Sequence, residues 1–360
     1  MNTESGVANI PYDTIDLTGE RIMLVGGAGF IGHHLALELR RKGAEIVVLD
    51  NLQINNVVKI LTDASLDPVR RQLYLNFLTS RFEMMREAGI HIETVDARMF
   101  PEFARAFNTF LPTKAVHLAA ISSAVVANQV PGLAYDLQIT SLRHLLDLCQ
   151  LKESVCRQVQ FLSSSTVYGD FEGSSVDETV RPQPKGVYAN GKYMGERMMR
   201  EAKRLFGLDY TIIRPSALYG IRCISGRVSQ KFVENAMTGK PLLLEGGGSG
   251  MLDFTHIDDL IEGMVRSLGV SGGLSRTFNI TFGNARTIAE LAAIVKDVVP
   301  EVKFEERPAA AEKPKRGTLH IHRAKEYLGF VPSRPLETGY REYCQWYVNE
   351  WRRAAAMVGK

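Results

Sequence analysis

A tyrosine and a lysine four residues apart are the residues of this chain best suited to do chemistry together. Tyr188 and Lys192 stand in the segment VYANGKYMGE, and residues four apart share one face of a helix. A phenol normally ionises at about pH 10, but a neighbouring ammonium stabilises the phenolate and lowers its pKa. The pair therefore predicts a tyrosine that takes up and returns a proton near neutral pH.

A run of hydroxyl side chains is the third member of such a site. Ser164, Ser165 and Thr166 follow the expected strand over residues 159–163. Ligands bind at the carboxyl ends of strands in open parallel sheets, so a hydroxyl there can hold the reacting oxygen while Tyr188 moves its proton. Each pattern alone is ambiguous, because surface helices also carry Tyr and Lys at this spacing and serines after strands commonly act as caps. Their joint occurrence after a glycine turn favours catalysis.

Three glycines between an expected strand and an expected helix form the strongest local signal. Gly26, Gly29 and Gly32 lie in GGAGFIG, directly after the apolar run RIMLV. In a dinucleotide-binding turn the first glycine permits the tight turn, the second lets the backbone approach a pyrophosphate, and the third lets helix and strand pack closely. The free N–H groups of the helix then face the phosphates.

Asp50 indicates which dinucleotide this turn would bind. It ends the next expected strand, about 20 residues after the glycines, where a carboxylate accepts hydrogen bonds from both ribose hydroxyls. The same carboxylate would repel the 2′-phosphate of NADP, so the sequence favours NAD. Asp96, after the third strand, is expected either near the adenine or as an ordinary loop aspartate.

Short apolar runs alternate with longer helical patterns along most of the chain. Each run is almost continuously apolar, as expected of parallel strands covered on both faces. The alternation predicts an α/β fold, a Rossmann-type doubly wound parallel sheet, with a smaller, discontinuous C-terminal substrate lobe. A late helix is predicted to begin after Thr287, which forms a capping-box pattern with Glu290. The expected strands are RIMLV, EIVVL, HIETV, AVHLA, VQFLS, YTIIR and TFNIT.

The expected domain organisation follows from where this alternation fades. Segment 55–89 is too long for a simple connection, and its periodic apolar residues predict one or two added helices. Their expected role is extra packing, with a dimer contact or a substrate lid as the alternative. The expected parts are an N-terminal extension (1–20), an NAD-binding domain (21–215 and 252–282) and a substrate-binding lobe (216–251 and 283–360).

The composition excludes several classes of protein. Lys and Arg number 43 against 40 Asp and Glu, and they are scattered, so no nucleic-acid partner is expected. No apolar run approaches the ~20 residues of a membrane span and no signal pattern is present, which predicts a cytoplasmic protein without a membrane partner. Four sparse cysteines predict free thiols. No metal is expected, because His33 and His34 are adjacent and adjacent helix residues should point in different directions.

The motifs together resemble a known family. GGAGFIG, LDNL, HLAA, FLSSSTVYG, YANGK, RPSALYG and LDFTHIDD are similar to successive motifs of the extended short-chain dehydrogenases/reductases, in particular the NAD-dependent epimerase/dehydratase family. These motifs span Arg21 to about Asp259, and KEYLGFVPSRPLETG resembles the family's C-terminal lobe. The combination is specific for the family and much less specific for the substrate.

The resemblance implies a role for each matching residue. Tyr188 is the implied base, Lys192 the ribose-binding lysine and Ser164 the catalytic hydroxyl, with Ser165 and Thr166 beside it. NAD is the implied cofactor. Its implied contacts are Gly26, Gly29, Phe30, Ile31, Gly32, Asp50, Asn51, Asp96, Leu118, Ala119, Ala120, Tyr188 and Lys192.

The chain departs from the family's pattern at three positions. Gln138 stands where the family usually has Asn, and Gly191 where it usually has Ser. Leu252 replaces an arginine that often binds the diphosphate of a sugar nucleotide. Another cation must serve if the substrate is a nucleotide sugar, and the candidate substrate-binding residues are Arg222, Arg227, Lys315 and Arg316.

The resemblance implies an NAD-dependent nucleotide-sugar epimerase, and C4 epimerisation through a transient 4-keto intermediate is the leading hypothesis. A UDP-sugar is the expected substrate and a homodimer is implied by the family. The alternative is another C4-oxidising enzyme, a uronic-acid decarboxylase or a 4-ketosugar reductase. Dehydration is not expected, because family members that dehydrate carry Asp-Glu where this chain has Ser165-Thr166. A non-catalytic NAD-sensing protein and a dehydrogenase of small molecules without a nucleotide are hypotheses of other kinds.

Overall fold

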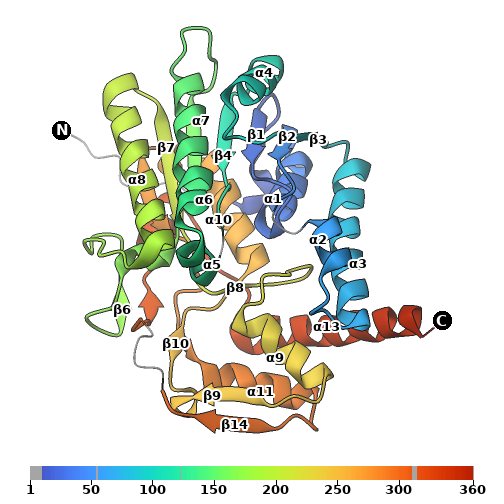
Figure 1. Ribbon diagram of the computed structural model, residues 1–360. Coiled ribbons are helices and arrows are strands. Elements are labelled where there is room, and N and C mark those ends of the chain that lie inside the picture. The colour runs from blue at the N-terminus through green and yellow to red at the C-terminus, as the bar shows by residue number, and fades with distance from the viewer. Residues whose placement is uncertain (1–9, 54–55, 122, 310–313, 360) are drawn as a thin grey trace.

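A seven-stranded parallel sheet organises the larger part of the molecule in the computed structural model, which describes residues 10–53, 56–121, 123–309 and 314–359 (Figure 1). The strand order is β12-β7-β5-β4-β1-β2-β3. The chain builds outward from β1 in one direction and then from β4 in the other, which leaves a crevice at the carboxyl ends of these two strands. The strands are β1 (Arg21–Val25), β2 (Glu45–Asp50), β3 (His91–Thr94), β4 (Lys114–His117), β5 (Gln158–Leu162), β7 (Asp209–Arg214) and β12 (Arg276–Asn279).

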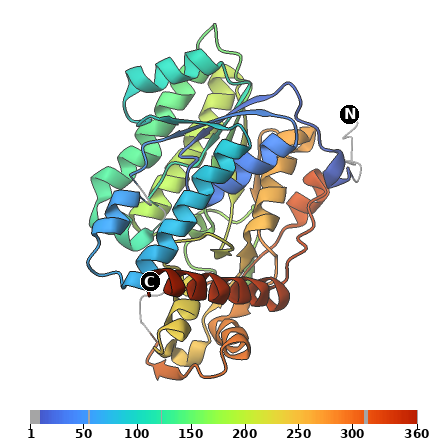
Figure 2. The ribbon, with the colours of Figure 1, turned by 90° about the vertical axis from the view of Figure 1, so that its right-hand side faces the viewer.

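Helices cover both faces of this sheet (Figures 1 and 2). Side chains alternate between the two faces along a strand, so Ile22 and Leu24 of β1 lie in one core while Met23 and Val25 lie in the other. Burial on both faces explains why the strands are continuously apolar. The first core contains α1 (Phe30–Arg41) and α10 (Ile257–Gly269), and the second contains α4 (Phe100–Phe110), α7 (Ser141–Cys149) and α8 (Gly186–Phe206).

A smaller lobe lies below the sheet in Figure 1. Two of its strands, β9 (Leu242–Glu245) and β14 (Phe304–Arg307), pair in parallel. The predicted capping box is confirmed, since Thr287 accepts a hydrogen bond from the N–H of Glu290 and the Glu290 carboxylate accepts one from the N–H of Thr287. The helices of this lobe are α9 (Val228–Met237), α11 (Ile288–Val298) and α13 (Leu336–Val358).

Segment 55–89 forms two helices, α2 (Val57–Thr62) and α3 (Pro68–Glu87), which confirms the prediction of added helices; Asn55 itself lies outside the described residues. The beginning of α3 packs against α13 beneath it, as Figure 2 shows. Leu73 and Phe77 of α3 lie in the core of the smaller lobe, whereas Met85, near its end, lies in the core under the sheet. This helix therefore connects the two parts of the molecule.

Short elements complete the fold. The described part of the N-terminal extension packs on the sheet through the buried side chains of Ile15 and Leu17. Among the helices that the structure describes, none has both the length and the apolar character needed to cross a bilayer. The remaining elements are β6 (Ser175–Val176) paired with β15 (Thr318–Leu319), β8 (Leu218–Tyr219) with β11 (Thr255–His256), β10 (Met251–Leu252) with β13 (Arg286–Thr287), and the helices α5 (Ala124–Gln129), α6 (Pro131–Tyr135), α12 (His322–Leu328) and η1 to η5 (Tyr12–Thr14, Asp136–Thr140, Ser165–Tyr168, Gly246–Gly248, Ser271–Gly273).

Candidate active site

The glycine turn connects β1 to α1, and two of its glycines are required by the protein itself. Gly26 has φ +78°, and a Cβ atom there would lie 2.7 Å from the backbone of Ala119. A Cβ atom at Gly32 would lie 2.2 Å from the carbonyl oxygen of Gly27, so only glycine lets helix and strand approach this closely. These two positions serve the tight turn and the packing that the motif predicts.

Gly29 is different, because nothing in the described part of the chain requires a glycine there. Its φ of −74° is open to any residue, and the nearest atom to an added Cβ would be the oxygen of Gly26 at 3.9 Å. The space that a side chain would fill lies beside the first N–H groups of α1, in the wall of a cavity. A dinucleotide pyrophosphate fits this observation, because it needs both the open space and the unpaired helix N–H groups.

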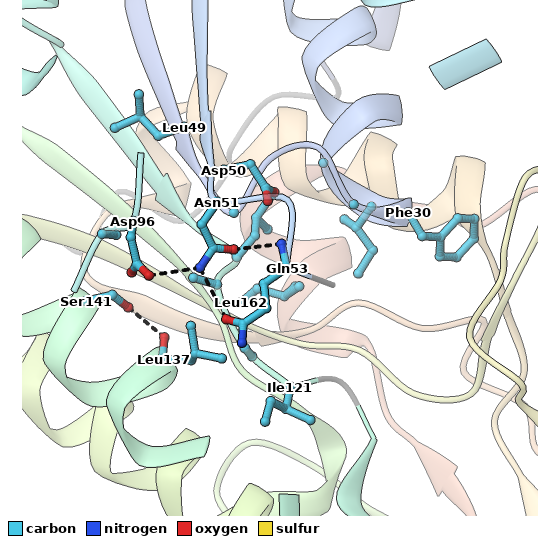
Figure 3. A pocket seen from close by; sticks show the side chains of 18 of the residues that line it. Phe30, Leu49, Asp50, Asn51, Gln53, Asp96, Ile121, Leu137, Ser141 and Leu162 are labelled. Atoms are coloured by element: carbon cyan, nitrogen blue, oxygen red, sulfur yellow. Dashed lines mark hydrogen bonds between the residues drawn. The ribbon is translucent and has the colours of Figure 1, made fainter. Parts of the chain in front are cut away.

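The cavity occupies about 390 Å³ at the carboxyl ends of the strands (Figure 3). Figure 3 shows the polar side chains of Asp50, Asn51 and Asp96 at one end and the apolar side chains of Ile121 and Leu162 further along it. Its lining includes all the predicted cofactor contacts except Tyr188 and Lys192: Gly26, Gly29, Phe30, Ile31, Gly32, Asp50, Asn51, Asp96, Leu118, Ala119 and Ala120.

Asp50 is held at the end of β2 by two backbone groups. The N–H of Leu52 donates to one carboxylate oxygen at 2.8 Å and the N–H of Ala28, in the glycine turn, donates to the other at 3.0 Å. Burial raises the pKa of Asp50, and these hydrogen bonds oppose the rise. Each oxygen keeps a lone pair for a further donor, so the carboxylate is placed to accept ribose hydroxyls.

Asp96 is engaged rather than free at the same end of the cavity. Its carboxylate accepts hydrogen bonds from Arg98, at 2.9 and 2.6 Å, and from the amide of Asn51 at 3.1 Å. The hydrogen bond to Arg98 is the largest reason why the pKa of Asp96 falls to about 2. Asp96 therefore orients Asn51 and Arg98 along the cavity wall.

The hydroxyl run follows β5, as predicted, and its members have different surroundings. Ser164 precedes the short helix η3 and accepts hydrogen bonds from the N–H of Thr166, at 3.2 Å, and from its hydroxyl, at 3.0 Å. Ser165 is buried, and its N–H donates to the carbonyl of Pro215. Thr166 thus uses its proton on Ser164, and Ser164 in turn lowers the pKa of Tyr188.

Ser163, one residue earlier, belongs to a buried ion-pair network behind the site. Its hydroxyl donates to Glu196 of α8 at 2.7 Å, and Arg214 of β7 donates to both carboxylate oxygens of Glu196 at 2.8 and 2.6 Å. Arg200 adds a further hydrogen bond at 3.1 Å. This network fixes α8, which carries Tyr188 and Lys192, against the ends of β5 and β7.

Tyr188 and Lys192 lie on one face of α8, as their spacing predicts. Tyr188 packs against the apolar group that contains Ile121 and Leu137, two residues of the cavity wall. Lys192 is buried, and its Nζ donates to the carbonyl of Leu162 at 2.7 Å. Neither side chain is in the cavity wall itself, but both contact residues that are.

The electrostatics of this pair differ from the sequence-based expectation. Burial raises the pKa of Tyr188, and the opposing effects are the charge on Arg227 and the hydrogen bond from Ser164. The Nζ atom of Lys192 lies 5.9 Å from the centre of the Tyr188 ring. Burial lowers the pKa of Lys192 to about 7. The charge that lowers the pKa of Tyr188 is therefore that of Arg227, whereas the sequence pointed to Lys192.

The four candidate substrate cations fall in different places. Arg227 lines the cavity. Arg222 turns away from it, and its Nε donates to His33 at 3.2 Å. Arg316 donates to the carbonyl of Gly169 and lies over the ring of Phe171, while the backbone N–H of Lys315 donates to Asp170. Only Arg227 of the four contributes to the cavity wall.

The prediction that His33 and His34 point apart was wrong. Their ring centres lie 4.0 Å apart, because His33 reaches back to the carbonyl of Gly29 and His34 reaches the carbonyl of Ile221 in a neighbouring loop. Burial lowers the pKa of both, so both are neutral. Within the described residues no group of three or more His, Cys, Asp or Glu side chains is arranged to hold a metal ion.

Gln138 and Gly191, two departures from the family's pattern, are in contact. A Cβ atom at Gly191 would lie 2.7 Å from the side-chain oxygen of Gln138. Gln138 is fully buried, and its amide has no partner in the part of the chain that the structure describes. The longer Gln138 thus occupies the space that a side chain at position 191 would need.

Sequence reasoning missed more than half of the cavity wall. Two of these residues, Ile224 and Ser225, stand in the same loop as Arg227, so that arginine was the available signal. Most of the others are apolar or ordinary polar residues with no distinctive pattern. The missed residues are Leu49, Gln53, Lys59, Val95, Ala97, Arg98, Ile121, Ser123, Val126, Leu137, Ser141, Leu162, Ile224 and Ser225.

Comparison with known proteins gives consistent matches over most of the chain. The model of the NAD dependent epimerase/dehydratase family matches residues 22–281. UDP-glucuronate 4-epimerase 1 of Arabidopsis thaliana is 29% identical over 350 residues, covering 92% of this chain and 77% of the relative. UDP-glucuronic acid decarboxylase 4 of the same plant is 28% identical, covering 89% and 66%. The solved structure of UDP-glucose 4-epimerase from Thermus thermophilus in complex with NAD is 25% identical, with a TM-score of 0.74, covering 92% of this chain and 99% of that chain.

Proposed function

The chain belongs to the NAD-dependent epimerase/dehydratase family, and from this premise we propose that it inverts C4 of a nucleotide-activated sugar, with a UDP-sugar as substrate. It is an enzyme of that family, and NAD is its cofactor. One observation carries the proposal: Tyr188 and Lys192 lie on one face of α8, directly behind the wall of the cavity that fits a dinucleotide. Arg227 and Ser164 both lower the pKa of Tyr188 there. The similarity to a UDP-glucuronate 4-epimerase supports C4 as the reacting carbon.

In this mechanism Tyr188 accepts the proton of the C4 hydroxyl group as the C–H bond at C4 breaks. When bound, NAD supplies an acceptor for the hydride and the donor that returns it to the other face of the sugar. Ser164 holds the reacting oxygen by a hydrogen bond, and Tyr188 gives its proton back to that oxygen when the hydride returns. The same proton and hydride leave and return, so no net oxidation results.

Lys192 and Arg227 position the reactants in this proposal. Lys192 lies behind Leu162 of the cavity wall, from where it is proposed to bind the ribose next to the nicotinamide. Arg227 is proposed to take the diphosphate contact for which Leu252 has no charge, because it alone of the candidate cations lines the cavity. Its guanidinium would bind the diphosphate of the substrate and lower the pKa of Tyr188.

The residues after Ser164 argue against dehydration. Elimination of water needs a carboxylate for the C5 proton, and Ser165 and Thr166 provide only hydroxyl groups. Asp170 and Glu172 are the carboxylates that could substitute; Glu172 is exposed, and Asp170 forms an ion pair with Lys185 at 2.6 Å and also accepts the N–H of Lys315. That carboxylate is therefore committed elsewhere.

The test uses deuterated water. After a thermal-shift screen of UDP-, GDP-, CDP- and dTDP-sugars identifies a ligand, the product is analysed by NMR and mass spectrometry. An epimerase gives the C4 epimer with no deuterium at C5 or C6. A 4-keto-6-deoxy product, or deuterium at C5, would overturn the assignment.

A second candidate is decarboxylation of a UDP-sugar acid, because a UDP-glucuronic acid decarboxylase is as similar to this chain as the epimerases are. Both reactions begin with oxidation at C4, so the cofactor and Tyr188 would serve either. UDP-glucuronate separates them, since a decarboxylase releases CO2 and forms a pentose, while an epimerase keeps all carbon atoms.

A further inference from the structure

One loop supplies the substrate side of the cavity. Residues 220–227, here called the substrate loop, connect β8 to α9 and bring Ile224, Ser225 and Arg227 to the cavity wall. The loop has φ values of +150° at Gly220, +60° at Arg222 and +63° at Gly226. A non-glycine residue rarely adopts φ +60° unless its surroundings impose it, so contacts from outside must hold this loop.

The first such contact comes from Arg81 of α3. Its side chain is completely buried, and Nη2 donates to the carbonyl oxygen of Arg222 in the substrate loop. Nε and Nη1 have no partner within the described residues, and the nearby group Arg222 is also a cation. Burying a guanidinium group with two unpartnered nitrogen atoms costs free energy. The hydrogen bond from Nη2 to the substrate loop is the contact that this buried group makes.

The second contact runs from Tyr74 through α9. The Tyr74 hydroxyl donates to Glu234 at 2.6 Å and accepts from the amide of Gln230 at 2.8 Å. The side-chain oxygen of Gln230 accepts the N–H of Gly226 at 3.0 Å. This chain of hydrogen bonds therefore ends at Gly226, the residue directly before Arg227.

Both contacts come from one face of a well-anchored helix. Tyr74 and Arg81 are seven residues apart, which is two helical turns, and Arg70 on the same face forms an ion pair with Glu234 at 3.0 Å. The helix is fixed in the lobe by Leu73 and Phe77 and under the sheet by Met85. It can therefore hold the loop in place relative to the sheet and to α8.

We propose that α3 sets the position of Arg227 relative to Tyr188, with Arg81 and Tyr74 as positioning residues for the substrate. This gives the added helices a role in the reaction beyond packing. The consequence for catalysis rests on the proposed function of Arg227 and Tyr188, but the support of the loop by α3 does not.

Limited proteolysis of the NAD-loaded enzyme tests the support of the loop without any substrate. Trypsin cleaves after arginine, and the loop contains Arg222 and Arg227. Tyr74→Phe and Arg81→Met should raise cleavage at these two bonds roughly 3- to 10-fold, as loss of one hydrogen bond implies, and leave other sites unchanged. The matched control is Arg71→Met, because Arg71 of α3 donates to the carbonyls of Asp63 and Leu66 and not to the loop.

Tyr74→Phe keeps the test decisive even if Arg81→Met does not fold, since it removes a single oxygen atom. Unchanged cleavage after Arg222 and Arg227 in Tyr74→Phe would overturn the proposal. Faster cleavage at every site would do so too, because it would mean a general loss of stability.

Kinetics with the nucleotide sugar then test the consequence. Both variants should raise KM by a similar 3- to 10-fold factor while NAD binding stays unchanged, and Arg81→Lys, which keeps one donor, should recover part of the loss. Loop cleavage that rises without any change in KM would show that the loop does not position the substrate. If the wild-type protein turns over no nucleotide sugar, the proposed function fails, and the proteolysis result still decides the role of α3.

Discussion

The two halves of the cavity are built in different ways. The proposed cofactor half is formed mainly by the ends of β1, β2 and β4 and by the glycine turn, where backbone atoms and the register of the sheet determine most positions. The proposed substrate half is formed by the loop 220–227, which accepts a side-chain hydrogen bond from α3 at Arg222 and donates one to a side chain of α9 at Gly226. Backbone geometry is shared by the whole sheet, whereas a loop depends on a few contacts. A substitution in one half should therefore change the affinity for NAD or for the substrate, but not both.

Replacement of the base should have the largest effect and should spare both halves. Tyr188→Phe keeps the ring against Ile121 and Leu137 but removes the hydroxyl. We expect turnover to fall by about 10²–10⁴, the usual contribution of a positioned acid–base group, with NAD and substrate affinity retained. Near-normal turnover, measured beside cofactor content and thermal stability, would remove Tyr188 from the mechanism.

The glycine turn allows a sharper test within the cofactor half. Gly32→Ala places a Cβ 2.2 Å from the oxygen of Gly27 and should destabilise the fold by about 3 kcal/mol. Gly29→Ala meets no protein atom closer than 3.9 Å and should keep the stability of the cofactor-free protein while it weakens NAD binding. Urea unfolding measures the stability, and calorimetric titration with NAD measures the affinity. If Gly29→Ala bound NAD normally, the pyrophosphate would not lie beside residue 29.

Arg227→Gln tests the substrate half. Loss of a charge-assisted hydrogen bond should raise the KM of the nucleotide sugar by roughly 10- to 100-fold and leave NAD affinity unchanged. The charge of Arg227 lowers the pKa of Tyr188, so its removal raises that pKa. The base must be deprotonated to act, and the acidic limb of the kcat/KM profile should therefore move to higher pH. An unshifted limb would mean that Arg227 does not act on Tyr188.

The smallest predicted effect concerns Gln138 and Gly191. Gly191→Ser adds atoms that meet the Gln138 amide at 2.7 Å and should destabilise the protein by about 1 kcal/mol. Gln138→Asn in the same chain makes room and should restore stability, so the two changes are coupled. A double-mutant cycle by urea unfolding measures this coupling, and additive effects would contradict the contact.

The sequence predicted the glycine turn and the place of Asp50 at the end of β2 well because their geometry is local. Gly26, Gly29 and Gly32, followed by Asp50 at the next strand end, define a turn whose geometry changes little with tertiary context. The seven strands and the added helices were predicted for the same reason, since periodicity depends on neighbours along the chain.

Which of the four candidate cations line the cavity could not be predicted, because a sequence pattern does not tell in which direction a charged side chain points. Arg222 and Arg227 stand in the same loop. Arg222, with φ +60°, donates to His33, whereas Arg227 lines the cavity. The reduced pKa of Lys192 was not foreseen either, because burial depends on how α8 packs on β5. Such features follow from tertiary contacts that no short pattern contains.

The open space at Gly29 has a consequence for reading related sequences. Gly32 is needed for folding, so it would persist in a relative that had abandoned its cofactor, and its presence says little about catalysis. No contact within the described residues requires Gly29, and if only the dinucleotide needs it, genetic drift would be free to replace it once that ligand was no longer used. Within this fold, the residue at position 29 is therefore a better mark of a working dinucleotide site than the complete glycine motif.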